Sequence, residues 1–228
     1  MNKILFIIIF LLAFPVRAET VGWISDIHAG KEKDKVNMDS RIVYPNMYQS
    51  LLKKTIRIFR VKGIKNVIIT GDIIESKKSY RRKVLNIFKK KRIKVIAVNG
   101  NHDGMKMNYF TKDVGNTRVV VLDTNYCGPE KSSGGICPAQ LRWLNYVLNT
   151  NKDVLIASHQ PIFDHRNGYG LFPIYNDFKR TIEFHQNVKM MISGHQHKEH
   201  QIDENGITYR IANAFSDGRH PNFYFLEL

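Results

Sequence analysis

Short apolar runs recur along the chain, and each ends abruptly in residues that bind metals or carry protons. Five of these runs lack the alternation of polar and apolar positions that marks a half-exposed strand, so they predict strands buried on both faces. They span residues 21–25, 66–70, 94–98, 153–158 and 189–193. Two later segments, residues 207–212 and 223–228, predict two further, antiparallel strands.

Helical stretches separate these strands. The predicted helices span residues 44–61, 79–91, 139–149 and 174–186, and apolar residues recur at helical spacing in the third. Strands that alternate with helices predict an α/β fold in which helices pack on the sheets. Ligands of such folds bind beyond the carboxyl ends of the strands, which is where the metal-binding and proton-carrying residues fall.

The first eighteen residues have the pattern of a secretory signal peptide. Lys3 precedes an apolar run from Ile4 to Phe14, Pro15 breaks the run, and Val16-Arg17-Ala18 supplies a small-x-small cleavage site. A membrane anchor is the alternative, but this run is well short of the roughly 20 residues that span a bilayer. We therefore predict cleavage near Ala18, export to the periplasm or the exterior, and a single domain over residues 19–228.

Composition narrows the class of protein and raises the question of an anionic partner. A chain of 228 residues that is 43% hydrophobic is globular, and its two cysteines exclude a disulfide scaffold and a Cys₄ zinc module. The formal net charge is +15, and the segment from Lys77 to Lys94 holds ten Lys or Arg and no acid. This segment is either a solvated helix face or a docking surface for an anionic polymer or membrane. No obligate protein partner is evident.

The polar residues after the strands form a set of oxygen and nitrogen donors with no thiolate. Carboxylate, amide and imidazole donors suit Mn, Fe or Zn, and seven donors exceed the needs of one ion. Two divalent ions about 3.5–4 Å apart would use them, and such pairs stabilise an in-line displacement at phosphorus. The candidate ligands are Asp26, His28, Asp72, Asn101, His159, His195 and His197.

The order of these motifs resembles that of the calcineurin-like metallophosphoesterases. The family pattern is matched by Asp26-Ile-His28, Gly71-Asp72, Gly100-Asn101-His102-Asp103, Ser158-His159 and Gly194-His195-Gln-His197. The resemblance covers nearly the whole chain after residue 18 and implies a four-layer αββα sandwich, with two mixed β-sheets flanked by helices. It also implies a phosphate-ester substrate, either a phosphodiester or a phosphomonoester.

The resemblance further implies a role for each residue. Asp26, His28 and His197 would hold one metal ion, Asn101, His159 and His195 the other, and Asp72 would bridge them. Hydroxide held at the ions would attack phosphorus, and His102 would protonate the leaving oxygen as general acid. Glu75 would orient the His102 ring.

The second motif departs from the family pattern at one position. It commonly continues Gly-Asp-x-x-Asp-Arg, whereas this chain reads Gly71-Asp72-Ile-Ile-Glu75-Ser76. The phosphate-gripping Arg is therefore missing, and Lys77, Lys78 or Arg166 are candidates to replace it. The loop of residues 161–173 directly follows His159, so Arg166, His165 and Tyr169 are candidate substrate contacts, with Asn101 beside them.

The leading hypothesis is an exported dimetal phosphoesterase, and two alternatives stay open. One is a nuclease or protein phosphatase of the same fold. The other is a basic binding module that has lost catalysis, against which stands the complete ligand set. In an exported protein, Cys127 and Cys137, ten positions apart, are expected to form a disulfide, and two buried free thiols are the alternative.

Overall fold

The structure, a computed structural model, describes residues 18–36, 42–128, 134–162 and 175–228. The strands and helices follow one another in the order β1 (Thr20–Ile24), β2 (Lys35–Val36), β3 (Ile42–Val43), η1 (Pro45–Met47), α1 (Tyr48–Val61), β4 (Asn66–Ile69), α2 (Lys78–Lys89), β5 (Lys94–Ala97), β6 (Phe110–Val114), β7 (Thr117–Val121), α3 (Pro138–Val147), β8 (Asp153–Ala157), α4 (Tyr175–Phe184), β9 (Val188–Ser193), β10 (His200–Glu204), β11 (Ile207–Ile211) and β12 (Tyr224–Glu227).

Two mixed sheets form the centre of the molecule. The four-stranded sheet has the order β12-β1-β4-β5, in which β1, β4 and β5 are parallel and β12 is antiparallel to β1. The six-stranded sheet has the order β10-β11-β9-β8-β7-β6, with β7, β8, β9 and β11 parallel and the two edge strands antiparallel. Strands β2 and β3 form a separate small pair.

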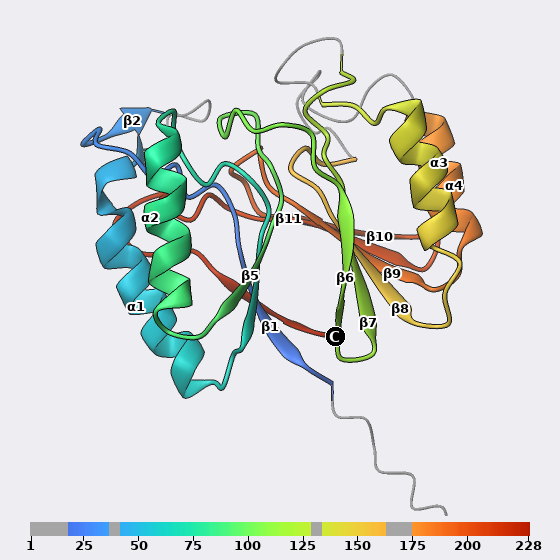
Figure 1. Ribbon diagram of the computed structural model, residues 1–228, viewed down its shortest axis with the longest axis horizontal. Helices are drawn as coiled ribbons and strands as arrows, with labels where there is room; N and C mark the ends of the chain where they lie inside the picture. Colours follow the sequence, from blue (N-terminus) through green and yellow to red (C-terminus); the bar gives the residue numbers. More distant parts are fainter. Residues whose placement is uncertain (1–17, 37–41, 129–133, 163–174) are drawn as a thin grey trace, which may run out of the picture.

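The two sheets lie face to face between two helical layers. Helices α1 and α2 cover the outer face of the four-stranded sheet, and α3 and α4 cover that of the six-stranded sheet (Figure 1). Apolar side chains from both sheets, among them Trp23, Ile68 and Leu155, are buried between them. The predicted αββα sandwich is therefore confirmed.

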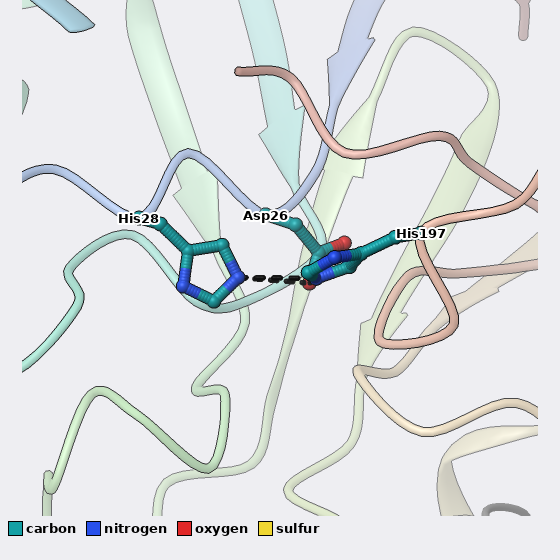
Figure 2. A group of neighbouring side chains, drawn as sticks. All are labelled: Asp26, His28 and His197. Atoms are coloured by element: carbon teal, nitrogen blue, oxygen red, sulfur yellow. Dashed lines mark hydrogen bonds and ion pairs between the residues drawn. The ribbon is translucent and has the colours of Figure 1, made fainter. Parts of the chain in front are cut away.

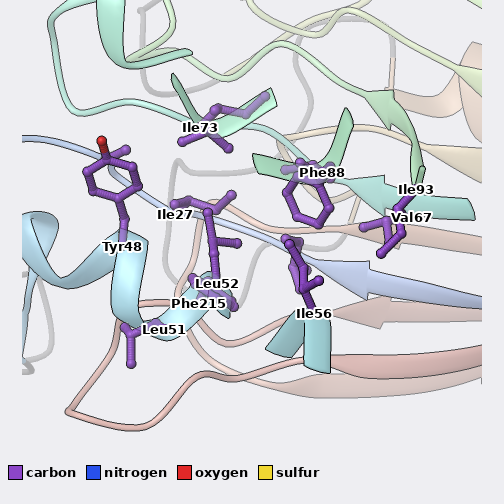
Figure 3. Close-up of a cluster of buried hydrophobic side chains, with 14 of the residues drawn as sticks. Ile27, Tyr48, Leu51, Leu52, Ile56, Val67, Ile73, Phe88, Ile93 and Phe215 are labelled. Carbon is purple, nitrogen blue, oxygen red and sulfur yellow. The ribbon is translucent and has the colours of Figure 1, made fainter. Parts of the chain in front are cut away.

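The burial pattern explains why α1 and α2 form where they do. The buried positions of α1 recur every three or four residues and include Leu51, Leu52 and Phe59, so one face of the helix is apolar. Phe88 of α2 packs into the same cluster of buried side chains (Figure 3). Gly63 ends α1 at a φ of +71°, because its missing side chain permits the left-handed conformation that lets Ile64 N–H bond to the Phe59 carbonyl.

The structure corrects several predicted element boundaries. Helix α1 begins at Tyr48 rather than residue 44, because Pro45 starts a 3₁₀ turn and the Tyr44 N–H bonds to the Ser216 carbonyl. The strand predicted at residues 207–212 is present as β11, and it is antiparallel to β10 but parallel to β9. The prediction of an antiparallel strand therefore describes only one of its two neighbours. Strand β12 is antiparallel, as expected, but it pairs with β1 in the other sheet.

Three predictions about the ends and loops have different outcomes. Residues 1–17, which hold most of the predicted signal peptide, lie outside the described residues, as do Arg166, His165 and Tyr169. Among the described residues, no helix combines the length and the apolar character that crossing a membrane requires. Cys127 and Cys137 form the expected disulfide, with their Cα atoms 5.2 Å apart.

Candidate metal centre

The predicted site residues converge at the carboxyl ends of strands from both sheets. Asp26 and His28 follow β1, Asp72 follows β4, and Asn101 follows β5 in the four-stranded sheet. His159 follows β8, and His195 and His197 follow β9 in the six-stranded sheet. The site therefore lies where the carboxyl ends of the strands of the two sheets meet, and each sheet supplies some of its residues.

At most of these residues the backbone adopts the left-handed conformation, which residues other than glycine rarely adopt. Seven residues other than glycine have a positive φ among those described, and five of them are candidate ligands. The φ angles of these five lie between +45° and +68°, and the residues are Asp26, His28, Asp72, His195 and His197. Such conformations cost about 1–3 kcal/mol each and persist where the surrounding structure enforces them, which is typical of functional sites.

Three of these side chains form one compact group (Figure 2). The Nε2 atoms of His28 and His197 are 3.1 Å apart, and His197 Nε2 is 3.3 Å from Asp26 Oδ1. Their ligand atoms all lie within 4.8 Å of one another, so a single cation can contact all three. Asp26 is fully buried, and its carboxylate is held by Ser25 Oγ at 2.5 Å.

The second group surrounds Asp72, and it also contains His159 and Asn101. Asp72 Oδ2 lies 3.3 Å from His159 Nε2 and 3.7 Å from His28 Nε2, so this carboxylate stands between the two groups. His159 Nε2 lies 2.9 Å from Asn101 Oδ1. The imidazole of His195 packs edge-on against that of His159, with the ring centroids 5.0 Å apart. The backbone N–H of His195 donates to the Asp26 carboxylate.

Hydrogen bonds fix which nitrogen of two histidines is available to a metal. His28 Nδ1 lies 2.8 Å from Glu75 Oε2, and His159 Nδ1 lies 2.8 Å from the Thr70 carbonyl oxygen. Because both partners only accept, each Nδ1 carries the proton and each Nε2 is directed into the site. Oriented imidazoles with a carboxylate or carbonyl behind them are the arrangement found at metal ligands. The residues present therefore fit a pair of divalent ions bound through nitrogen and oxygen.

The electrostatics of the group favour bound positive charge. Burial raises the pKa of Asp26, but the neighbouring His197 and His159 outweigh it and lower that pKa to about 2. Burial also opposes charge on His159, yet the Asp72 and Asp26 carboxylates raise its pKa to about 10. For His195 burial dominates and, with the His159 charge, lowers the pKa to about 4. The Asp26 and Asp72 carboxylates therefore favour a cation beside them. A proton and a metal ion compete for His159 Nε2.

His102 lies at the edge of the site, with a side chain that is 31% exposed. Its Nδ1 donates to the backbone carbonyl of Glu75 at 3.0 Å, and its Nε2 is 4.0 Å from Asp72 Oδ2. The Glu75 carboxylate lies farther away, 3.6 Å from His102 Nδ1, and bonds to His28 instead. The expected contact between Glu75 and His102 is therefore present, but the carbonyl makes the hydrogen bond.

The sequence alone indicated no role for the polar residues that support the loop of residues 99–103, although Asp103 belongs to one of the sequence motifs. Asp103 accepts the Gly100 and Ile74 N–H groups and pairs with Arg81 at 3.3 Å. Asp123 accepts a hydrogen bond from the Asn99 side chain. A signal for Asp123 was present, because residues 119–122 are another apolar run that is followed by an acid.

Two motif glycines leave room for the neighbouring ligands. A side chain at Gly100 would overlap the Asp72 carboxylate and backbone, and one at Gly194 would overlap Ser25 and Asp26. These glycines are therefore required by close approach between loops of different strands.

The structure describes two of the three residues expected to replace the missing arginine. Lys77 and Lys78 are exposed at the start of α2, and the Lys78 side chain passes over Gly104, two residues beyond His102. Arg166 lies outside the described residues. Arg81 is engaged by Asp103 and Asn99.

Comparisons with known proteins agree with this fold. Over an alignment of 90 residues, this chain is 30% identical to the manganese-dependent ADP-ribose/CDP-alcohol diphosphatase of Arabidopsis thaliana. The alignment covers 37% of this chain and 29% of that protein. The crystal structure of a dimetal phosphatase from Danio rerio matches with a TM-score of 0.79 at 19% identity, over 93% of each chain. GAP50 of Plasmodium, described as the anchor in the inner membrane complex, matches with a TM-score of 0.59 at 12% identity, over 92% of this chain and 78% of that one.

The model of the calcineurin-like phosphoesterase family matches residues 20–199, which contain every candidate metal ligand. The chain therefore belongs to the calcineurin-like phosphoesterase family, which indicates a metal-dependent phosphoric ester hydrolase.

Proposed function

We propose that this protein is a dimetal phosphoesterase that hydrolyses phosphate esters. The observation that carries the proposal is the meeting of two donor groups around one buried carboxylate, Asp72, at the junction of the sheets. One ion is assigned to Asp26, His28 and His197, and the other to Asn101, His159 and His195, with Asp72 between them. Manganese, iron and zinc all suit these donors, and the manganese-dependent plant relative makes Mn²⁺ the first ion to test.

The residues around the ions divide the remaining work. When bound, the ions supply positive charge for the phosphoryl oxygens and activate a water molecule. His102 donates its Nδ1 proton to a carbonyl, so Nε2 is the atom from which a proton passes to the leaving oxygen. Its partial exposure lets it reach a bound ester, and the fixed ring lowers the cost of orienting it.

The substrate is proposed to be a phosphodiester or a diphosphate rather than a monoester. Ser76 replaces the arginine that the family pattern uses to grip a terminal phosphate, and Arg81 is occupied by Asp103. A substrate with a substituent on both sides of phosphorus depends less on such a grip. The diphosphatase activity named for the plant relative supports including diphosphate-linked compounds among the substrates.

Export from the cytoplasm is also part of the proposal. The signal-peptide pattern of residues 1–18 supports it, and so does the Cys127–Cys137 disulfide, because disulfides persist mainly in oxidising compartments. Mass spectrometry of protein recovered from the producing cells tests this: a mature chain that begins near Glu19 is expected. A full-length chain retained in the cytoplasm would contradict export.

Activity and metal content test the main proposal together. Purified protein is expected to contain about two divalent ions, to hydrolyse bis-p-nitrophenyl phosphate with Mn²⁺, and to lose that activity after chelation. Asp72→Ala should lower turnover by at least about 10³-fold, because both groups lose their shared carboxylate. Asp113→Ala, at an acid of β6 distant in the fold, is the matched control and should leave turnover unchanged. Wild-type turnover in Asp72→Ala contradicts the assignment.

The same assay separates the alternatives. Comparison of diesters, monoesters, diphosphate-linked nucleotides, nucleic acid and a phosphoprotein distinguishes the proposed substrate class from a nuclease or protein phosphatase. Metal binding without hydrolysis of any of these would favour a non-catalytic binding module.

A further inference from the structure

The positive charge of the chain is concentrated in one contiguous stretch. Residues 48–102, which form α1, β4, α2 and β5, contain 16 Lys or Arg and only two acids, Asp72 and Glu75, both at the candidate site. Their formal net charge is +14, out of +15 for the chain. The remaining residues are therefore close to neutral, and a uniformly lysine-rich composition does not explain the distribution.

Nearly all of these charged side chains are exposed to solvent. Fifteen of the sixteen side chains are exposed, and the exception is Arg81, which pairs with Asp103. Among the described residues, none of the fifteen forms an ion pair with a carboxylate. We call these fifteen residues the basic helical face, because most lie on α1, α2 and the turns that follow them.

The helical layer on the opposite side of the molecule provides an internal comparison. Helices α3 and α4 contain three basic and two acidic residues. The basic residues of α4 are paired, with Arg180 bonded to Asp177 at 2.5 Å and Lys179 to Glu204 at 2.8 Å. The layer of α3 and α4 is therefore nearly neutral, whereas the layer of α1 and α2, on the opposite side of the sheets in Figure 1, is strongly positive.

A groove between α1 and α2 combines this charge with apolar surface. Lys53, Arg57, Arg60 and Lys91 line it, together with the aliphatic side chains of Ile56 and Ile87. Val61, the last residue of α1, also lines the groove and is 83% exposed, whereas Ile56 is buried and Ile87 is half-buried. Basic side chains around an exposed aliphatic one are a pattern that binds the surface of an anionic bilayer, with headgroups at the charges and the aliphatic side chain at the acyl boundary.

The same face lacks the groups that bind single-stranded nucleic acid. Such binding relies on exposed aromatic side chains on which bases stack. Neither α1 nor α2 has an exposed aromatic residue: Tyr48 is buried, and the Tyr80 ring is covered by the Lys83 ammonium at 4.5 Å. The aliphatic tip at Val61 gives no base contact but can enter a lipid headgroup layer.

We propose that the basic helical face docks the protein on an anionic lipid surface. The face covers the outer side of the four-stranded sheet, whereas the candidate metal centre lies at the carboxyl ends of the strands (Figure 1). Docking through this face leaves the site open to substrate. The proposal is independent of which ester is cleaved, because it rests on the charge and exposure of α1 and α2 alone.

Sedimentation with lipid vesicles tests the proposal on the whole protein. The protein should bind vesicles of equal parts phosphatidylglycerol and phosphatidylcholine and should not bind vesicles of phosphatidylcholine alone. High salt should release it from the mixed vesicles. Each basic residue near such a surface contributes about fivefold in affinity. The triple variant Arg57→Glu, Arg60→Glu, Lys91→Glu should therefore bind at least about a hundredfold more weakly.

A matched control removes the same charge from elsewhere. The triple variant Lys112→Glu, Arg142→Glu, Lys189→Glu changes three exposed residues of β6, α3 and β9 and has the same net charge. It should keep most of the vesicle affinity. Equal losses in both triple variants, or none in the first, would overturn the proposal. Should the first variant melt early, the triple Gln variant at the same three positions serves instead.

A second measurement distinguishes lipid from nucleic acid. Val61→Trp should show a blue-shifted tryptophan emission with the mixed vesicles, because the side chain enters a less polar environment. It should show no such shift with duplex DNA. Tighter binding to duplex DNA than to the vesicles at the same salt concentration, without the emission shift on vesicles, would overturn the lipid assignment in favour of nucleic acid.

Discussion

Glu75 supports two histidines of the candidate site through two different groups. Its carboxylate holds His28 Nδ1 at 2.8 Å, and its backbone carbonyl accepts from His102 Nδ1 at 3.0 Å. The carboxylate therefore acts mainly on a metal ligand, and the carbonyl acts on the candidate proton donor. Substitution of the side chain removes only the first of these contacts, so the two roles can be separated by experiment.

Glu75→Gln is expected to weaken metal binding rather than proton transfer. The amide can still accept from His28 but lacks the charge that makes the imidazole a better ligand, so Mn²⁺ affinity should fall by about 10–100-fold. Calorimetric titration measures this. Glu227→Gln, at the far end of β12, is the control and should bind Mn²⁺ as the wild type does. A selective loss on esters with poor leaving groups, with normal Mn²⁺ affinity, would show instead that the carboxylate acts through His102.

His102→Gln is expected to separate the proton donor from the metal ligands. The variant should keep its metal content yet lower turnover by about 10²–10⁴-fold on alkyl esters, whose leaving oxygen needs a proton. The loss should be smaller on nitrophenyl esters, whose leaving group is stable without one. Equal losses on both kinds of ester would refute the general-acid role, and a loss of metal would make His102 a ligand.

The sequence predicted the members of the site but not the features that hold them in place. Polar clusters at the ends of five buried strands predicted that residues such as Asp26 and His195 would meet, and they do. The positive φ angles were not predictable, because they depend on loops that press against one another across two sheets. The contacts of Arg81 with Asp103 and Asn99 were missed for the same reason, since helix α2 positions that side chain.

At the level of elements, most strands with an apolar run were predicted, although β7 was missed, and the two polar edge strands of the six-stranded sheet were not predicted. Strand β8 is buried at four of its five positions, and its apolar run marks it clearly in the sequence. Strands β6 and β10 lie at opposite edges of the same sheet and are largely polar, so their pairing partners rather than their composition make them strands. The start of α1 was misplaced because a hydrogen bond from Tyr44 to Ser216 is not visible in the local sequence.

The disulfide should contribute measurably to the stability of the segment before α3. Cys137 is the residue that precedes α3, and its bond to Cys127 closes a loop between residues ten positions apart. The double variant Cys127→Ser, Cys137→Ser is expected to lower the free energy of unfolding by about 2–3 kcal/mol through loop closure. Urea unfolding measures this, and reduction of the wild type should give a similar loss. Two alkylatable thiols in unreduced wild-type protein would contradict the bond.

At the level of the whole molecule, the candidate metal centre draws its donors from both sheets. Asp26, His28 and Asp72 extend from the four-stranded sheet, whereas His159 and His197 extend from the six-stranded one. A cation bound to Asp26 and His197 therefore links the two sheets directly. Because the donors come together only in the folded chain, the free energy of metal binding adds to the free energy of folding.

Metal binding is accordingly expected to raise the melting temperature of the whole chain. Mn²⁺ at about a hundredfold excess over its dissociation constant adds about 2.7 kcal/mol, which corresponds to roughly 5–10 °C for a domain of this size. Calorimetry of the chelated and Mn²⁺-loaded protein measures the shift. Asp72→Ala should show little of it, because that variant lacks the carboxylate between the two groups, whereas His102→Gln should keep all of it. A protein that binds two ions with no change in melting temperature would mean that the unfolded chain binds them equally well, and the assignment of ligands that come together only on folding would be wrong.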